Sequence, residues 1–178
     1  MARIFAVTGG NKGIGKSIVK LLLQDKSNKM VYLTARNEEL GKNAIKELND
    51  SFGLKAKFHQ LDITNLSSIN RMRNYLLKNY GGLDVLVNNA GFAYKGSSTA
   101  PFSEQAEVTS NINFFGTLNV CDILFPILKP NSKVVNVSSF ISEYAYHKLS
   151  LEVKSRLSDP NLSMEGNNCI CHFCHLYS

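Results

Sequence analysis

Short segments rich in apolar residues alternate with longer amphipathic segments along the first 140 residues. Five short segments have the composition of buried strands: residues 4–7, 30–34, 56–61, 85–87 and 134–137. Four longer segments lie between them and repeat apolar residues at helical spacing: residues 14–23, 37–50, 67–80 and 106–128. Buried strands joined by helices are typical of a parallel sheet covered on both faces, and right-handed crossovers place helices on both sides. The sequence therefore predicts an α/β fold with a doubly wound, Rossmann-like parallel sheet.

The pattern changes after Ser139, and this change sets the expected domain boundaries. Residues 1–140 are predicted to form the sheet domain. Residues 141–164 are expected to be a partial helical insertion, with one amphipathic helix around Val153. Residues 165–178 show no periodicity and are expected to form an irregular tail rich in cysteine and histidine.

The charge of the chain favours anionic ligands. It carries 20 lysine and arginine residues against 14 aspartate and glutamate residues, a formal net charge of +6. The basic residues are scattered, so a small phosphorylated ligand fits this charge better than a nucleic acid. No apolar run approaches the ~20 residues that cross a bilayer, and the N-terminus has no pattern of a signal peptide. We expect a cytoplasmic protein with reduced thiols, and neither a membrane nor a nucleic acid as partner.

Three of the four cysteines, Cys169, Cys171 and Cys174, lie in the last ten residues, whereas Cys121 lies alone in an apolar segment. Residues 171–175 match the C-x-x-C-H signature of haem attachment, but attachment requires export, for which no signal is seen. The cysteines and histidines of the tail are also too close together to supply four zinc ligands without strain. The sequence therefore predicts no metal site.

Four glycines lie between the first predicted strand and the first predicted helix: Gly9, Gly10, Gly13 and Gly15. The unpaired N–H groups at a helix N-terminus bind anions, and glycine lets phosphate oxygens approach the backbone. The glycine loop is therefore a candidate phosphate site.

Two motifs fit this loop equally well. Residues 10–17 match the G-x-x-x-x-G-K-S phosphate loop of nucleoside triphosphatases, and residues 8–15 match the T-G-x-x-x-G-x-G loop of short-chain dehydrogenases. A triphosphatase also needs an acidic residue at the end of a later strand, and Asp62 would meet that requirement. The loop alone leaves both families open.

Three further motifs favour the second family. Asn88-Asn89-Ala90-Gly91 follows the fourth predicted strand, Asn113 lies early in the long predicted helix, and residues 135–139 read Val-Asn-Val-Ser-Ser at the end of the fifth strand. In this order and spacing, these motifs resemble those of the short-chain dehydrogenase/reductase family. The resemblance covers roughly residues 3–140, with a weaker match beyond.

Residues 81–91 and 113–117 are similar to the NADPH-dependent carbonyl reductase branch of that family. The resemblance implies five strands in the order 3-2-1-4-5, with the C-terminal part of the family fold missing from this chain. It also implies an oxidoreductase that transfers hydride from NADPH to a ketone, an aldehyde or a quinone. The phosphate-loop triphosphatase remains as a remote alternative.

The resemblance assigns the cofactor to the glycine loop and to the ends of the neighbouring strands. NAD-specific sites usually carry an acidic residue at the end of the second strand, where this sequence has Arg36. Arginine can bind a 2′-phosphate through two parallel hydrogen bonds, so NADPH is the expected cofactor. Asp62 resembles the aspartate that binds the adenine amino group, with a turn or helix-cap role as an equal alternative. Asn89 either braces the sheet beside the adenosine pocket or is a plain turn residue. The full set expected to bind the cofactor is Thr8, Gly9, Asn11, Lys12, Gly13, Ile14, Gly15, Arg36, Asp62, Ile63, Asn89, Ala90 and Gly91.

The family uses a serine, an asparagine and a Tyr-x-x-x-Lys pair for catalysis. By resemblance, Ser139 hydrogen-bonds the carbonyl oxygen and Asn113 supports a proton-relay water. The only Tyr-x-x-x-Lys in the chain is Tyr144 to Lys148, and four residues separate Tyr144 from Ser139. The family has at least a dozen residues there, and four residues span at most ~14 Å, which leaves no room for a helix to start. We therefore expect Tyr144 and Lys148 not to be the catalytic pair.

Two functions stay open. The chain is either a carbonyl reductase-like oxidoreductase that is catalytically incomplete, or a non-catalytic truncated isoform or fragment that binds NADP(H). The expected partner is a small carbonyl substrate. Because later strands of the family sheet are missing, the fifth strand, residues 134–137, is expected to form an open apolar edge, which predicts self-association.

Overall fold

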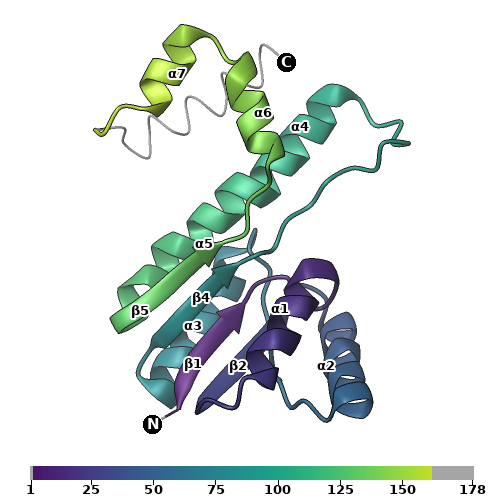
Figure 1. Cartoon of the computed structure of the whole chain (residues 1–178), viewed down its shortest axis with the longest axis vertical. Helices are drawn as coiled ribbons and strands as arrows, with labels where there is room; N and C mark the ends of the chain where they lie inside the picture. The colour runs from purple at the N-terminus through teal and green to yellow at the C-terminus, as the bar shows by residue number, and fades with distance from the viewer. Residues whose placement is uncertain (1, 162–178) are drawn as a thin grey trace. The chain divides into compact units, whose positions relative to one another are not determined.

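The structure, a computed structural model, describes residues 2–161 (Figure 1). The chain divides into two compact units. The first unit contains residues 1–93 and 111–137, and the second contains residues 94–110 and the chain from residue 138 onward. The elements of the first unit are β1 (Arg3–Val7), α1 (Gly13–Gln24), β2 (Lys29–Ala35), α2 (Glu38–Phe52), β3 (Lys57–Gln60), α3 (Leu66–Tyr80), β4 (Leu83–Asn88), the π-helical turn η1 (Asn111–Gly116), α5 (Thr117–Leu124), the 3-10 turn η2 (Phe125–Ile127) and β5 (Leu128–Asn136).

All five strands of the first unit run parallel, in the order β3-β2-β1-β4-β5. Val7, at the end of β1, is level with Leu33 of β2 and Val87 of β4. The carboxyl ends of these three strands therefore meet at one edge, which is where parallel α/β sheets bind ligands. The predicted Rossmann-like sheet and its strand order are confirmed.

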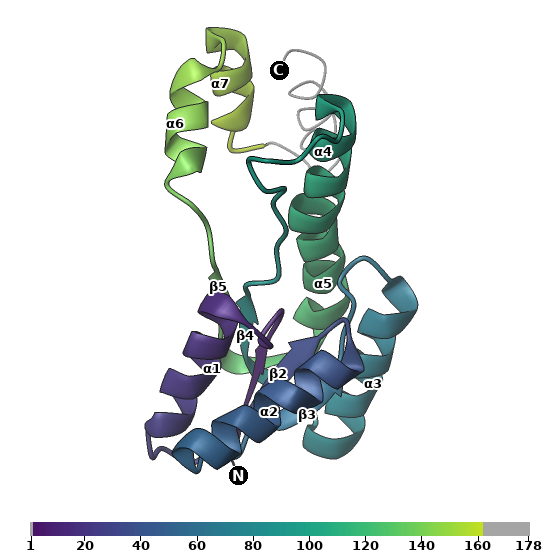
Figure 2. The ribbon, with the colours of Figure 1, turned by 90° about the vertical axis from the view of Figure 1, so that its right-hand side faces the viewer.

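The two faces of the sheet are buried under different helices, as Figure 2 shows. On one face, Val19 of α1 and Leu48 of α2 join Val7 in a buried cluster. On the other face, Met72 of α3 and Leu124 of α5 belong to a second cluster. A strand buried on both faces is apolar on both, which is why residues 4–7 of β1 and 85–87 of β4 do not alternate with polar residues.

Helices α2 and α3 begin and end at residues suited to those positions. The Asn37 side chain accepts a hydrogen bond from the Leu40 N–H, and Asn65 caps α3 in the same way. Each helix ends at a glycine with left-handed backbone angles, Gly53 with φ 65° and Gly81 with φ 67°. These caps fix where the loops between strands and helices begin.

The segment expected to be one helix over residues 106–128 is divided in the structure. Helix α4 (Phe102–Ser110) precedes η1, α5 and η2, and strand β5 already begins at Leu128, six residues before the predicted start. Proline at position 126 favours the 3-10 turn η2, because proline cannot donate the hydrogen bond of a continuing helix. The early part of β5 is irregular, with a register shift against β4 and a positive φ at Asn131, so its sequence lacks a strand pattern.

Over residues 141–161, the structure contains two helices where the sequence predicted one. Helix α6 (Ile141–Lys148) precedes α7 (Leu151–Leu157), and the Ser150 side chain caps α7 by accepting from the Val153 N–H at 3.3 Å. The boundaries proposed from the sequence at residues 140 and 164 stay a prediction. The tail over residues 165–178, with Cys169, Cys171 and Cys174, lies outside the described residues.

Candidate functional site

Thr8, the residue after β1, joins the ends of β1 and β4. Its side chain is buried, and its Oγ1 accepts hydrogen bonds from the N–H groups of Asn89 and Ala90, both at 2.9 Å. In return, the Asn89 Nδ2 donates to the carbonyl oxygens of Thr8 at 2.9 Å and Gly9 at 3.3 Å. The glycine loop and the motif after β4 therefore form one hydrogen-bonded structure. The role expected for Asn89 beside the adenosine pocket stays a prediction.

The loop also needs glycine for steric reasons. Gly9 has a φ of 63°, in the left-handed region that favours glycine. A side chain at Gly15 would collide with Asn89 and with the carbonyl oxygen of Gly9. A Cβ at Gly13 would instead meet no atom within 4 Å. Gly9 and Gly15 allow the loop to pack tightly, and the space beside Gly13 is open to a ligand.

The N-terminus of α1 is left without a protein cap. The side chain of its N-cap residue, Lys12, makes no cap hydrogen bond, and the first turn contains no acidic residue. The first N–H groups of a helix and the positive end of its dipole attract an anion. This arrangement suits the pyrophosphate of a dinucleotide.

Lys16, the lysine of the alternative phosphate-loop motif, pairs with another helix. Its Nζ lies 2.8 Å from Oε1 of Glu47 in α2. In a triphosphatase this lysine reaches the phosphates of the nucleotide. The pairing with Glu47 gives no support to the triphosphatase alternative.

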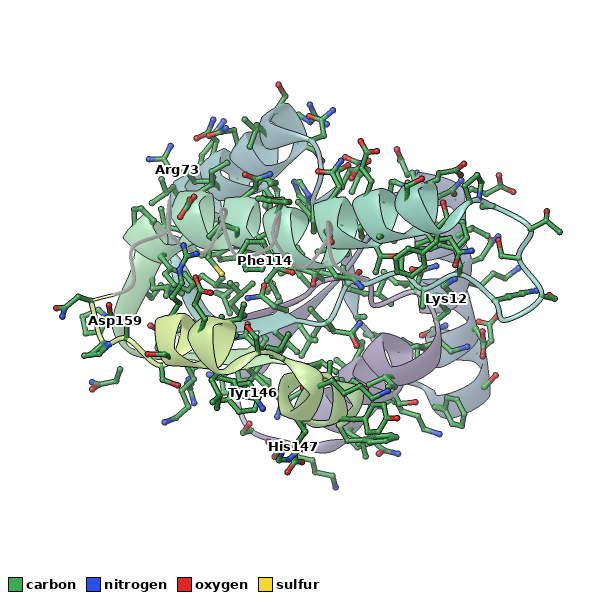
Figure 3. The ribbon with its side chains drawn as sticks, turned by 90° about the horizontal axis from the view of Figure 1, so that it is seen from above. Lys12, Arg73, Phe114, Tyr146, His147 and Asp159 are labelled. Atoms are coloured by element: carbon green, nitrogen blue, oxygen red, sulfur yellow. The ribbon has the colours of Figure 1, made fainter. Side chains whose placement is uncertain are left out.

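Two exposed cations, Arg36 and Lys12, follow β2 and β1 respectively, at the edge where these strands end. Figure 3 labels Lys12 in the loop before α1. Within residues 2–161, no carboxylate forms an ion pair with either side chain. The backbone of Arg36 is held by Gln60, whose Nε2 donates to the Arg36 carbonyl oxygen at 3.1 Å. Both charges are therefore available to a phosphate group.

Asp62 and Ile63 follow β3 and have different environments. The Asp62 Oδ1 accepts hydrogen bonds from the Thr64 N–H at 3.0 Å and the Thr64 hydroxyl at 2.7 Å. These bonds are those of a turn residue, one of the roles considered for Asp62 from the sequence. The cap of α3 is Asn65, so Asp62 does not have the helix-cap role. Its Oδ2 has no hydrogen-bond partner in the described part of the chain, so adenine recognition by that oxygen stays a prediction. The Ile63 side chain is buried in the core, so only its backbone is available to a cofactor.

Asn113 clamps the loop that follows β4. Its Oδ1 accepts from the Phe92 N–H at 2.7 Å, and its Nδ2 donates to the Phe92 carbonyl oxygen at 2.9 Å. It lies in η1, and π-helical turns occur frequently at functional sites. The side-chain amide is thus used to fix the backbone beside Gly91. A role for Asn113 in a proton relay stays a prediction.

Ser139 follows β5 in the second unit, and its carbonyl oxygen accepts from the Ser142 N–H at 3.1 Å. The expectation that no helix could start before Tyr144 is wrong, because α6 begins at Ile141. Phe140 already has helical angles, φ −62° and ψ −19°, and only residues 137–139 separate it from the end of β5 at Asn136. This compact turn removes the argument from chain length.

Tyr144 and Lys148 lie one turn apart in α6. The Lys148 Nζ lies 4.5 Å from the centroid of the Tyr144 ring, in a cation–π contact. Ser139 lies before α6, outside the helix that carries Tyr144 and Lys148. The expectation that these two residues are not the catalytic pair stays a prediction.

Sequence reasoning missed the polar residues that support the site. The buried Thr34 donates from its hydroxyl to the Val7 carbonyl oxygen at 3.0 Å, and its own carbonyl accepts from the Gly10 N–H at 2.8 Å. A polar residue at the end of an otherwise apolar strand was the available signal.

Among residues 2–161, no group of three histidine, cysteine, aspartate or glutamate side chains is placed to hold a metal. In that same range, no helix is long and apolar enough to cross a membrane.

Comparisons with known proteins agree with this geometry. A model of the short chain dehydrogenase family matches residues 3–151. Carbonyl reductase [NADPH] 1 from Mus musculus is 49% identical over 159 residues, which cover 89% of this chain and 57% of that protein. The chain thus spans less than two thirds of the length of this relative.

Solved structures show the same fold. Salutaridine reductase from Papaver somniferum matches with a TM-score of 0.84 at 29% identity, over 98% of this chain and 70% of that chain. A metagenomic short-chain oxidoreductase in complex with NADP matches with a TM-score of 0.64 at 26% identity, over 77% of this chain and 62% of that chain. With its glycine loop, its strand order and these relatives, the chain belongs to the short chain dehydrogenase family, in its carbonyl reductase branch.

Proposed function

We propose that this chain binds NADPH at the ends of β1, β2 and β4, in a site that serves the reduction of a small ketone, aldehyde or quinone. The observation that carries the proposal is Arg36, exposed and without a carboxylate partner in the described residues, where an NAD site carries an acid. The uncapped N-terminus of α1 would hold the pyrophosphate, and Arg36 with Lys12 would hold the 2′-phosphate. The names of the curated relatives and the NADP complex of a structural neighbour support this choice of cofactor.

When bound, NADPH supplies a hydride to the carbonyl carbon, so the carbonyl oxygen needs a hydrogen-bond donor and then a proton. Ser139 is the proposed donor. Asn113 would support a relay water through its backbone, because its side-chain amide is occupied by Phe92. Neither residue is itself the proton source in this scheme.

The missing part of the proposed mechanism is the proton donor. The only Tyr-x-x-x-Lys pair within these 178 residues, Tyr144 and Lys148, holds the lysine over the ring face rather than beside the hydroxyl. We therefore propose that the 178-residue chain binds NADPH but catalyses carbonyl reduction poorly. A non-catalytic module that binds NADP(H) is the second candidate, and the same observation favours it. The substrate and a cytoplasmic location stay predictions.

The test is a matched pair of charge reversals, Arg36→Asp and Arg73→Asp. Arg36 is exposed, whereas Arg73 is half-buried on α3, far from Lys12 in Figure 3. Arg36→Asp should weaken NADPH binding by about 1.5–3 kcal/mol, the range for a hydrogen bond to a charged group, and leave NADH binding nearly unchanged. Titration by cofactor fluorescence measures both constants. Equal losses in the two variants, or no loss in either, would contradict the proposal.

A further inference from the structure

A chain of hydrogen bonds passes through Gln60, the last residue of β3. The Asp62 N–H donates to Ser68 Oγ at 3.0 Å, and Ser68 Oγ donates to Gln60 Oε1 at 3.0 Å. At the other end of the same amide, Gln60 Nε2 donates to the Arg36 carbonyl oxygen at 3.1 Å. One side chain therefore connects the residue proposed for the 2′-phosphate with the residue proposed for the adenine.

The orientation of the Gln60 amide follows from its neighbours. Ser68 Oγ accepts from the Asp62 N–H, so its own proton is left for Gln60 Oε1. Arg71 Nη2, which can only donate, approaches the same oxygen at 3.4 Å. The Arg36 carbonyl can only accept. A flipped amide would place donor against donor on one side and acceptor against acceptor on the other.

The chain of hydrogen bonds is fixed inside the protein at Ser68. This side chain is only 1% exposed, and the Ser68 N–H donates to Oδ1 of Asn65, the cap of α3, at 3.0 Å. The start of α3 therefore supports both Asp62 and Gln60. By contrast, the Arg36 side chain is exposed, so its backbone is the part that the protein can hold.

We propose that Gln60 is a positioning residue that sets the selectivity of the site for the 2′-phosphate. The inference rests on the proposed NADPH site. Gln60 holds the Arg36 carbonyl and so determines the direction in which the backbone leaves β2 toward α2. That direction decides where the guanidinium lies. The adenine end depends less on Gln60, because Ser68 continues to accept from Asp62 without it.

Two substitutions distinguish the effect of Gln60 on the 2′-phosphate side from the effect of Ser68 on the adenine side. Gln60→Met keeps the length of the side chain and removes the bond to Arg36. It should raise the Kd for NADPH about twofold to tenfold, the range for one net hydrogen bond, and leave the Kd for NADH nearly unchanged. Ser68→Ala removes the bond to Asp62 and also the bond to Gln60. It should weaken both NADPH and NADH, because both cofactors carry the same adenine, and it should weaken NADPH more, because Gln60 loses a support as well.

Gln105→Met is the matched control. Gln105 Nε2 also donates to a backbone carbonyl, that of Ala100 at 2.8 Å, but it lies in the second unit. Its loss should change neither Kd. A general loss of stability would lower both affinities in proportion and leave their ratio unchanged, so the ratio of the two constants reports positioning.

Hydrogen exchange of backbone amides tests the role of Gln60 in the absence of cofactor. In Gln60→Met, the Leu40 N–H, which is bonded to Asn37 beside Arg36, should exchange about twofold to tenfold faster. No preference for NADPH in the unmutated chain would refute the proposed function. A preference that survives Gln60→Met unchanged, or unchanged exchange at Leu40, would overturn this inference alone.

Discussion

Replacing Asp84 by asparagine should lower the free energy of unfolding by about 1.5–3 kcal/mol at neutral pH, the range for hydrogen bonds to a charged group. Asp84 lies near the start of β4, and its Oδ2 accepts from the Ile4 N–H at 2.8 Å and from Lys129 Nζ at 3.0 Å. The carboxylate thus joins β1, β4 and β5. Its side chain is 17% exposed and that of Lys129 is 25% exposed, so water screens the pair only in part. Asparagine keeps an acceptor for Ile4 but leaves Lys129 without its counter-charge.

The same carboxylate makes stability depend on pH. Burial alone would raise the pKa of Asp84. The hydrogen bonds from Ile4 and Lys129, and the charges of Lys129 and Arg3, outweigh burial and hold the pKa below its ordinary value of 3.8. A lowered carboxyl pKa stabilises the folded state at pH values above the unfolded pKa. That stabilisation is lost as the pH falls through the folded pKa. The difference between the unmutated chain and Asp84→Asn should therefore be full at pH 7 and shrink in strong acid.

Urea unfolding of dilute protein, followed by circular dichroism at several pH values, measures this difference. Glu38→Gln is the control, because the pair of Glu38 with Lys42 is exposed on both sides and should contribute little. Equal effects of the two substitutions at pH 7 would refute the reasoning. A difference for Asp84→Asn that persists at pH values below the folded pKa would refute it as well.

Three further predictions concern activity, association and the clamp. Carbonyl reduction with NADPH should be weak, and Tyr144→Phe should not lower it further; robust turnover lost in Tyr144→Phe would show that Tyr144 is catalytic. The chain should self-associate through β5, the last strand of the sheet, where Val135 is 48% exposed. In sedimentation experiments, Val135→Lys should reduce association. Leu21→Lys, a control on the exposed face of α1, should not. A clean monomer of the unmutated chain at all concentrations would contradict this. Asn113→Ala should speed amide exchange at Phe92 about twofold to tenfold, and unchanged exchange would show that the clamp is dispensable.

The sheet could be predicted because burial on both faces leaves a strong signal in the sequence. The inner residues of β1, β2 and β4, at 4–7, 30–33 and 85–87, are apolar, and each strand is followed by a polar or glycine-rich turn at the edge proposed to bind the cofactor. Only the last three residues of β5, 134–136, were predicted to form a strand. The earlier part contains Pro130 and Asn131 and is held by pairing with β4, which the local sequence does not indicate.

Helix α6 and the Gln60 connection could not be predicted for different reasons. Tyr144 and Tyr146 of α6 are exposed, so this segment has no buried apolar stripe that would indicate a helix in the sequence. Gln60 belongs to no motif, because its role depends on a carbonyl and a hydroxyl that only the fold brings to it. Site residues on motifs are readable in a sequence, whereas the residues that support them are defined by tertiary structure.

The proposed NADPH site lies at the edge formed by β1, β2 and β4, with Arg36 as the residue that selects this cofactor. Calorimetric titration of the unmutated chain with NADPH and with NADH measures the selectivity. NADPH should bind more tightly by about 1.5–3 kcal/mol, roughly tenfold to a hundredfold in Kd. Equal binding of the two cofactors, or tighter binding of NADH, would contradict it.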